Sequence, residues 1–258
     1  MTRIGLSTVS VYPESTAHAF AYAKTVGYEA VEVMVGVDAL SQQTSAVLQL
    51  SEHHHVPISA VHAPCLLFTQ RVWGTDPWGK LERSAEMAHA VGAGTVVVHP
   101  PFRWQREYAV GFVEGIAKLE ANTGLFFAVE NMYPWRASRR SMQMYLPHWD
   151  PSTEDYASTT IDLSHAAIAQ DDVIEMARRL GDRLRHIHLT DGTDGAKDQH
   201  LVPGRGDMKA AAFLRHLATS GFDGEIVLEI NTRKAATKAE READLRESLE
   251  FAREHFRP

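Results

Sequence analysis

Short apolar runs rich in β-branched residues alternate with longer amphipathic runs along the whole chain. The short runs predict strands at 3–7, 30–34, 58–62, 95–99, 126–130, 159–162, 184–188 and 225–229. The longer runs have the apolar spacing of amphipathic helices and cover 14–26, 46–54, 80–91, 106–121, 172–180, 208–219 and 238–255. Strands that alternate with helices in this way predict βαβ units and a parallel sheet.

Eight such units, with no linker or change of composition between them, favour a closed barrel over an open sheet. An open doubly wound sheet normally carries a Gly-rich phosphate-binding turn after an early strand, and the sequence has none. The length of 258 residues also suits one barrel, which usually takes roughly 250 residues. We therefore predict an α/β fold made of a single (β/α)8 TIM-barrel domain over residues 1–258.

Composition narrows the range of partners. The chain carries 26 Lys and Arg residues against 33 Asp and Glu residues, so its net charge of -7 gives no overall attraction for nucleic acid or an anionic membrane. No run approaches the ~20 apolar residues of a membrane span, and the first strand pattern begins almost at the first residue. Cys65 is the one cysteine, which excludes disulfides within the chain. We expect a cytoplasmic protein, and a homo-oligomer remains open.

Six consecutive predicted strands end in a histidine or a carboxylate. In a TIM barrel the carboxyl ends of the strands meet at one mouth, where polar side chains serve catalysis. Burying so many ionisable groups costs several kcal/mol each unless a cation or tight pairing compensates. Imidazole and carboxylate groups without a thiolate suit Zn²⁺, Mn²⁺ or Fe²⁺. We therefore predict a divalent-metal site formed by the strand-end residues His62, His99, Glu130, Asp162, His188 and Glu229.

The strand ends resemble those of the xylose isomerase-like TIM barrel superfamily, also described as AP endonuclease family 2. This superfamily includes sugar epimerases and apurinic endonuclease IV, and the resemblance spans essentially the whole chain. Its most specific parts are the motifs Asp-Leu-Ser-His, His-Leu-Thr-Asp and Pro-Gly-Arg-Gly, which follow one another along the sequence. The resemblance implies a shared metal quartet on Glu130, Asp162, His188 and Glu229.

The epimerase branch of this superfamily implies a mechanism for these residues. There, one metal polarises a carbonyl and the neighbouring hydroxyl of the substrate, with manganese or zinc as the expected ion. Two carboxylates, equivalent to Glu130 and Glu229, then move a proton on opposite faces of the carbon. The resemblance thus implies a metal-dependent isomerase or epimerase that acts on a sugar, a sugar phosphate or a related polyol.

A second layer of matches resembles the endonuclease IV branch. It adds the residues His62, His99, His165, Asp198 and His200. By this resemblance His62 and His99 share one ion with Glu130, the quartet holds a second ion, and the remaining three residues hold a third. Adjacent ions can stabilise both the attacking and the leaving oxygen of a phosphoester. A phosphoesterase with a trinuclear zinc site is therefore the alternative, and the number of ions stays open between one and three.

Other features favour a sugar over DNA. The loop at 35–39 is short and lacks the basic and aromatic residues that the endonuclease branch inserts into DNA. The acidic net charge also opposes binding of a duplex, because phosphate contacts normally dominate that affinity. The run Val-Pro-Gly-Arg-Gly is similar to the sugar epimerases, in which Arg205 would contact a substrate hydroxyl or phosphate and His165 would orient the substrate. We expect a small-molecule sugar rather than nucleic acid.

The predicted loops after the third, fourth and fifth strands contain all the tryptophans of the chain. These loops lie on the same face as the metal site, and aromatic rings stack well on sugars. One hypothesis is that these loops form a lid over the substrate, in which Trp73 and Trp104 contact the substrate. The alternative is that the tryptophan rings pack the loops together or form a dimer interface. Glu32 either joins the pocket or pairs with a neighbouring base. His186 lies two residues before His188 on the same predicted strand, and we expect it to be a hydrogen-bonded core histidine.

Overall fold

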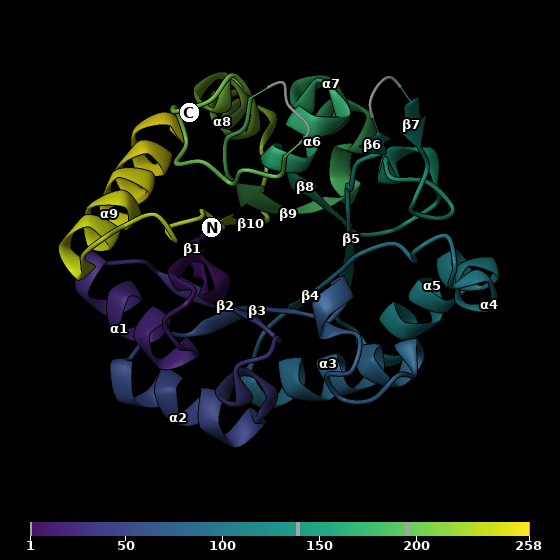
Figure 1. The fold of residues 1–258 in the computed structure, drawn as a ribbon, viewed down its shortest axis with the longest axis horizontal. Coiled ribbons are helices and arrows are strands. Elements are labelled where there is room, and N and C mark those ends of the chain that lie inside the picture. The colour runs from purple at the N-terminus through teal and green to yellow at the C-terminus, as the bar shows by residue number, and fades with distance from the viewer. Residues whose placement is uncertain (1, 138–139, 194–196, 258) are drawn as a thin grey trace.

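The structure is a computed structural model that describes residues 2–137, 140–193 and 197–257. Within these residues, eight parallel strands close into a barrel in the order β1-β10-β9-β8-β5-β4-β3-β2. The helices surround the barrel on its outside (Figure 1). The predicted (β/α)8 TIM barrel is therefore confirmed. Its strands are β1 (Ile4–Ser7), β2 (Ala30–Met34), β3 (Ile58–His62), β4 (Thr95–Val98), β5 (Phe126–Glu130), β8 (Thr159–Asp162), β9 (Leu184–Leu189) and β10 (Glu225–Leu228).

The helices follow the predicted amphipathic segments with two differences. Gly111 divides the segment expected as one helix at 106–121 into α4 and α5. The short helix α6 was not predicted, because six of its seven residues are buried and the segment has no polar face that would give it an amphipathic pattern. The helices are α1 (Thr16–Val26), α2 (Thr44–His54), α3 (Pro77–Val91), α4 (Arg106–Val110), α5 (Phe112–Thr123), α6 (Leu163–Ala169), α7 (Val173–Leu180), α8 (Ala210–Ser220) and α9 (Lys238–His255).

The strands are buried on both faces, as expected when helices cover a parallel sheet. All five residues of β2 and of β3 are buried, so a charged residue on such a strand has no solvent face to occupy. Register between neighbouring strands then decides which polar side chains meet. Asp162 at the end of β8 lies opposite His188 on β9. Two residues of the predicted quartet are thus side by side through backbone pairing alone.

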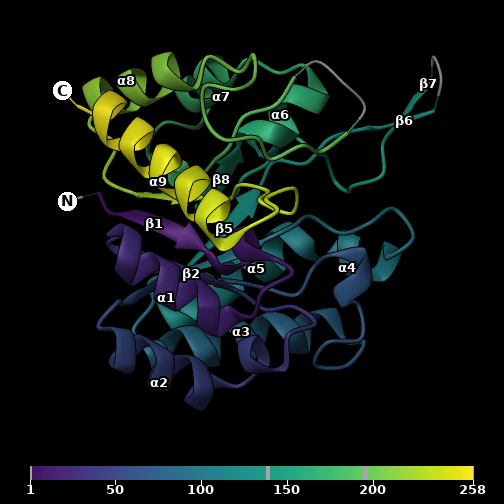
Figure 2. The ribbon, with the colours of Figure 1, turned by 60° about the vertical axis from the view of Figure 1, so that its left-hand side comes forward.

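The two ends of the barrel differ in what covers them. Figure 2 shows both chain termini on one side of the molecule and a hairpin on the opposite side, toward which β1 and β5 point. The hairpin consists of β6 (Trp135–Ala137) and β7 (Arg140–Met142), which pair antiparallel within the segment that follows β5. The hairpin was not predicted, because each of its strands has three residues, which is too short for an alternating pattern to be recognised. Among the helices in the described part of the chain, none has the length and apolarity that a membrane crossing requires.

The loop between β9 and α8 is held in place by one buried carboxylate. Asp191 accepts hydrogen bonds from the backbone N–H groups of Gly192 at 2.9 Å, Gly204 at 2.8 Å and Met208 at 3.1 Å. Three charge-assisted bonds to backbone groups fix the path of an otherwise irregular segment. This loop carries residues 198–200, two of which are predicted metal ligands. Asp191 therefore links barrel stability to the geometry of the mouth.

We predict that Asp191→Ala lowers the free energy of unfolding by about 3 kcal/mol, because three backbone N–H groups, one buried and two partly buried, lose their acceptor. Denaturation by guanidinium chloride, followed by circular dichroism, measures this change. The matched control is Asp207→Ala, since Asp207 is exposed in the same loop and should give a change near zero. Equal stabilities for the two variants would show that Asp191 does not hold the loop.

Candidate metal centre

The carboxylate of Glu130, at the end of β5, lies at the centre of the barrel mouth. Its Oε1 atom is 3.1 Å from Nδ1 of His188 and 3.2 Å from Nδ1 of His165. Its Oε2 atom is 3.0 Å from Nε2 of His99 and 3.4 Å from Nε2 of His62. The carboxylate is 1% exposed, so these contacts are made away from water. Four predicted metal ligands, all histidines from different parts of the barrel, thus surround a fifth, Glu130.

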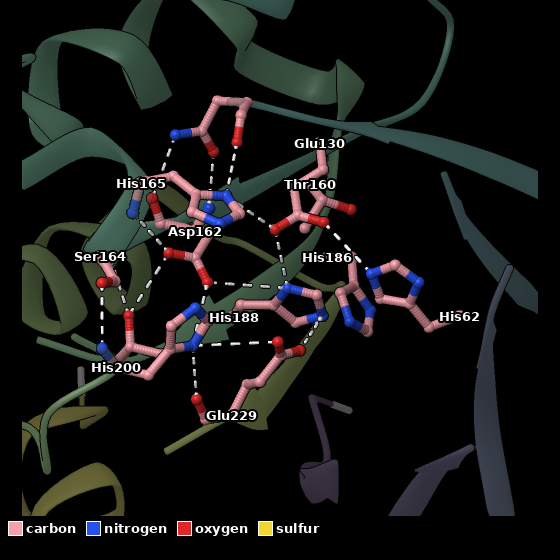
Figure 3. A network of polar contacts seen from close by, with 12 residues as sticks. His62, Glu130, Thr160, Asp162, Ser164, His165, His186, His188, His200 and Glu229 are labelled. Carbon is pink, nitrogen blue, oxygen red and sulfur yellow. Dashed lines mark hydrogen bonds and ion pairs between the residues drawn. The ribbon is translucent and has the colours of Figure 1, made fainter. Parts of the chain in front are cut away.

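The other members of the predicted quartet gather around the imidazole of His188 (Figure 3). Its Nε2 atom is 3.3 Å from Oε2 of Glu229, and its Nδ1 atom is 3.8 Å from Oδ2 of Asp162. Three carboxylate oxygens of the quartet, one each from Glu130, Asp162 and Glu229, are buried and accept no hydrogen bond within the described residues. Two of these oxygens lie near an imidazole nitrogen, but none accepts a hydrogen bond, and a divalent cation would satisfy them directly. The quartet therefore fits a metal ion.

A third group of predicted ligands lies beside the quartet. Oδ2 of Asp198 is 3.3 Å from Nε2 of His165 and 3.0 Å from Nε2 of His200. The other oxygen of Asp198 accepts a hydrogen bond from Ser164 Oγ at 2.7 Å, which fixes the orientation of the carboxylate. The structure thus brings all nine predicted ligands into one connected cluster.

Three sets of ligand atoms in the described residues are close enough together to hold an ion, with all atoms of a set within 4.8 Å of one another. That spacing matches ligands arranged around a cation with bonds of about 2.0–2.2 Å. Two of the sets consist of predicted ligands only. The third combines His188 with the two residues that lie deeper in the barrel. The sets are His62–Glu130–His188, Asp162–His165–His200 and Glu32–His186–His188.

Glu32 is a site residue that the sequence left undecided. Its carboxylate is 2.9 Å from Nε2 of His186 and 3.2 Å from Nε2 of His188, and all three side chains are fully buried. His186 is buried in the core as predicted and lies beside this carboxylate, but neither of its ring nitrogens makes a hydrogen bond within the described residues. The signal for Glu32 was available in β2, because a carboxylate in the middle of a strand buried on both faces must find a base inside the barrel.

Asn131 positions the predicted ligand Asp162 on the neighbouring strand β8, a role that was not predicted from the sequence. Its side-chain oxygen accepts a hydrogen bond from the backbone N–H of Asp162 at 2.6 Å, and its Nδ2 donates to the backbone oxygen of Asp162 at 3.1 Å. Oδ1 of Asp162 in turn accepts from the backbone N–H of His165 at 2.8 Å and caps α6. The cap directs His165 toward Glu130, so helix α6 is part of the site.

The pKa values of Glu130 and Glu229 are shifted in opposite directions. Burial alone would raise the pKa of Glu130, but His188 and His99 lower it well below its usual value. Burial raises the pKa of Glu229 to about 7, and Glu32 and Glu130 add to this rise while His188 and His200 oppose it. One carboxylate is therefore held ionised, while the other exchanges a proton near neutral pH.

The histidines compensate the negative charge of the cluster. Burial would lower the pKa of His200, but Asp198 and Asp162 raise it to about 10. Burial likewise opposes protonation of His188, yet Glu229 and Glu32 raise its pKa well above the usual value. Without a cation, protonated imidazoles thus neutralise the buried carboxylates.

A cavity of about 230 Å³ lies over this cluster and is lined by Asp198, His200 and Glu229, among others. Arg205, predicted to bind substrate, does not line it. The Nε atom of Arg205 donates to Glu247 at 2.9 Å, and its NH2 group lies 2.8 Å from Asp244, so α9 draws the guanidinium to the outside of the barrel. In the structure Arg205 is thus held away from this cavity, and its contact with a substrate stays a prediction.

Trp73 and Trp104 do not line the cavity over the cluster either. The indole N–H of Trp73 donates to the backbone oxygen of Gln42 at 3.2 Å, and the guanidinium of Arg83 lies over its ring. Trp104 stacks on Phe102 with a distance of 4.6 Å between ring centroids. Their placement corresponds to the alternative in which tryptophans pack the loops, rather than to a substrate-covering lid.

Comparison with known proteins places the chain in a family. A family model described as xylose isomerase-like TIM barrel matches residues 20–255. The chain belongs to this family. Family relatives include an uncharacterized protein of Mycobacterium tuberculosis, which is 47% identical and covers 98% of both chains. Fructoselysine 3-epimerases of Escherichia coli and Shigella flexneri are 33% identical over 72 residues, or 28% of this chain and 26% of theirs.

Solved structures with the same barrel include sugar epimerases. A D-tagatose 3-epimerase-like protein has a TM-score of 0.70 and 22% identity, and the match covers 98% of this chain and 99% of that one. A D-psicose 3-epimerase with D-tagatose from Clostridium cellulolyticum has a TM-score of 0.75 and 14% identity, with 100% of both chains covered. These matches show the shared fold, and the family match confirms the resemblance expected from the strand ends.

We predict that binding of Zn²⁺ or Mn²⁺ releases protons and strengthens as pH rises from about 6 to about 9. The reason is that His200, with a pKa of about 10, is protonated over most of this range and must lose its proton to bind an ion. Calorimetric titration of chelator-treated protein, in buffers with different heats of ionisation, counts the protons released.

The variant His200→Gln should release about one proton fewer than the unchanged protein. His216→Gln, on the barrel exterior, is the matched control and should not alter the count. A metal affinity that does not change with pH would mean that the histidines are neutral before the ion binds.

Proposed function

We propose that the protein is a divalent-metal-dependent sugar isomerase or epimerase in which Glu130 and Glu229 carry the proton. The observation behind this proposal is the placement of these carboxylates on opposite edges of one imidazole. Glu130 approaches Nδ1 of His188 at 3.1 Å, and Glu229 approaches its Nε2 at 3.3 Å. Their pKa values are shifted in opposite directions, which is the arrangement that separates a base from an acid.

The quartet supplies both the metal site and the proton carriers in this proposal. A divalent cation held by Glu130, Asp162, His188 and Glu229 would polarise a substrate carbonyl and acidify the neighbouring C–H bond. Glu130 is held ionised and so can accept a proton, while Glu229, with a pKa of about 7, can accept or donate one. Removal of the proton on one face and its return on the other inverts the carbon, and its return to the adjacent carbon isomerises the sugar.

Relatives support a sugar as the substrate. Fructoselysine 3-epimerase and D-psicose 3-epimerase are, by their names, enzymes that invert carbon 3 of a sugar or sugar derivative. The acidic wall of the cavity formed by Asp198 and Glu229 suits hydroxyl groups, which donate hydrogen bonds to carboxylates. We therefore propose a ketose or related polyol as the substrate class, with manganese or zinc as the ion because imidazole and carboxylate ligands suit both.

We predict that Glu229→Gln lowers kcat by about 1,000-fold, because an amide cannot exchange a proton. The assay screens ketoses and records deuterium incorporated from D₂O at the carbon next to the carbonyl, together with the metal content of each variant. Glu247→Gln, on α9 outside the site, is the matched control and should keep full activity. Unchanged exchange in Glu229→Gln would remove Glu229 from the reaction.

The second candidate function is a phosphoesterase with three ions, and the group His165–Asp198–His200 favours it. This group supplies ligands that a single-ion epimerase does not need. Elemental analysis of protein purified without chelator distinguishes the two functions, since one ion per chain supports the epimerase and three support the phosphoesterase. If one ion suffices, His200→Gln weakens turnover far less than Glu229→Gln. Equal losses of turnover in His200→Gln and Glu229→Gln, together with hydrolysis of a model phosphodiester by the unchanged protein, would establish the phosphoesterase instead.

A further inference from the structure

A second and larger cavity lies beside the one over the metal centre. Its volume is about 430 Å³, and it lies between the segment after β3, the start of α3 and the segment after β4. Both cavities are lined by Phe68 and His99, so they are neighbours that share part of a wall. His99 in turn contacts Glu130 at 3.0 Å. A ligand in the second cavity therefore lies next to the metal centre.

The side chain of Lys80 forms a buried part of this cavity, which we call the Lys80 cavity. Lys80 is 7% exposed, and its Nζ donates to the backbone oxygens of Thr69 at 3.2 Å and Gln70 at 2.7 Å. An ammonium group has three N–H donors, so these contacts leave one donor to be satisfied. No Asp or Glu in the described part of the chain forms an ion pair with it. A buried cation without an anion is unfavourable unless a ligand supplies the negative charge.

The charge of the Lys80 cavity is opposite to that of the metal centre. Its lining includes two cationic side chains, Lys80 and Arg71, and contains no carboxylate. Arg71 is exposed and also lacks an ion-pair partner within the residues described. The neighbouring cavity is lined instead by the carboxylates of Asp198 and Glu229. Cations gathered in a partly enclosed space without acids form a site for an anion.

We propose that the Lys80 cavity binds an anionic group, a phosphate or a carboxylate, of a substrate whose sugar end reaches the metal centre. The proposal rests on the proposed function for the sugar end, whereas the anion site follows from Lys80 and Arg71 directly. A volume of about 430 Å³ accommodates an anionic group together with part of its carbon chain. Gln70, Gln105 and Tyr108 also line the cavity and offer further hydrogen-bond donors.

The first experiment measures anion binding without turnover. Selenate is titrated calorimetrically into the metal-loaded protein and is located in crystals by its anomalous scattering. We expect selenate in the Lys80 cavity, with binding weakened roughly 10- to 100-fold in Lys80→Met and Arg71→Gln, since each variant removes a charged donor. Lys118→Met, an exposed lysine on α5, is the matched control and should bind selenate normally. If Lys80→Met does not fold, Arg71→Gln alone carries the comparison.

The second experiment identifies the source of the anion. Values of kcat/KM are compared for a ketose phosphate, a keto sugar acid of the same chain length and the neutral ketose. We expect the phosphate or the acid to be preferred, and Lys80→Met to lower kcat/KM for that substrate by roughly 10- to 100-fold while changing the neutral ketose little. Whichever anionic substrate shows the larger effect identifies the natural group.

The two proposals fail separately. Selenate that binds only at the metal centre, or equally in all variants, overturns the anion site even when a neutral ketose is turned over. Lys80-dependent selenate binding without turnover of any sugar supports the anion site and contradicts the sugar isomerase or epimerase. An equal loss of kcat/KM for neutral and anionic substrates in Lys80→Met and Arg71→Gln overturns the assignment of the cavity to the substrate's anionic group.

Discussion

The buried contact between Glu130 and four histidines is the interaction on which the rest of the mouth depends. One carboxylate joins residues from β3, β9, the segment after β4 and helix α6, so its position fixes theirs. The next residue in the chain, Asn131, extends this constraint to Asp162 by bonding both of its backbone polar groups. Such a network is stable only when its charges are balanced, either by protonated imidazoles or by a cation.

The barrel was predictable because its strands and helices alternate with clear and different periodicities. The predicted strands at 126–130 and 159–162 coincide with β5 and β8, and the six strand-end residues of the candidate metal site follow from the rule that parallel strands end at one mouth. The position of Arg205 was not predictable in the same way. It follows the site motifs in sequence, but the direction of its side chain is set by Glu247 and Asp244, some 40 residues later.

The remaining differences also have physical causes. Helix α6 is buried almost throughout, and its polar residues Ser164 and His165 face the site rather than solvent, so its sequence lacks the exposed polar face of an amphipathic helix. Glu32 lies one layer below the strand ends, so the rule that polar residues at strand ends meet at the mouth does not apply to it. The contacts with His186 and His188 in the structure show how its charge is compensated. The sequence of β2 alone does not show that Glu32 is paired with histidines of β9. The two strands are brought together only when the barrel closes.

The ligand sets share members, and this makes their occupancy interdependent. Glu130 uses one oxygen toward His188 and the other toward His62 and His99, so a cation that engages one oxygen leaves the other oriented toward the two histidines. A second cation there would find a prepared carboxylate and imidazoles. Burial would lower the pKa of His62, but Glu130 raises it, whereas burial lowers the pKa of His99 despite Glu130. Without a second cation, the proton that balances the charge is therefore held at His62. Occupancy of this second position is therefore set by the competition between a proton and a metal ion at His62, rather than by the presence of ligands alone.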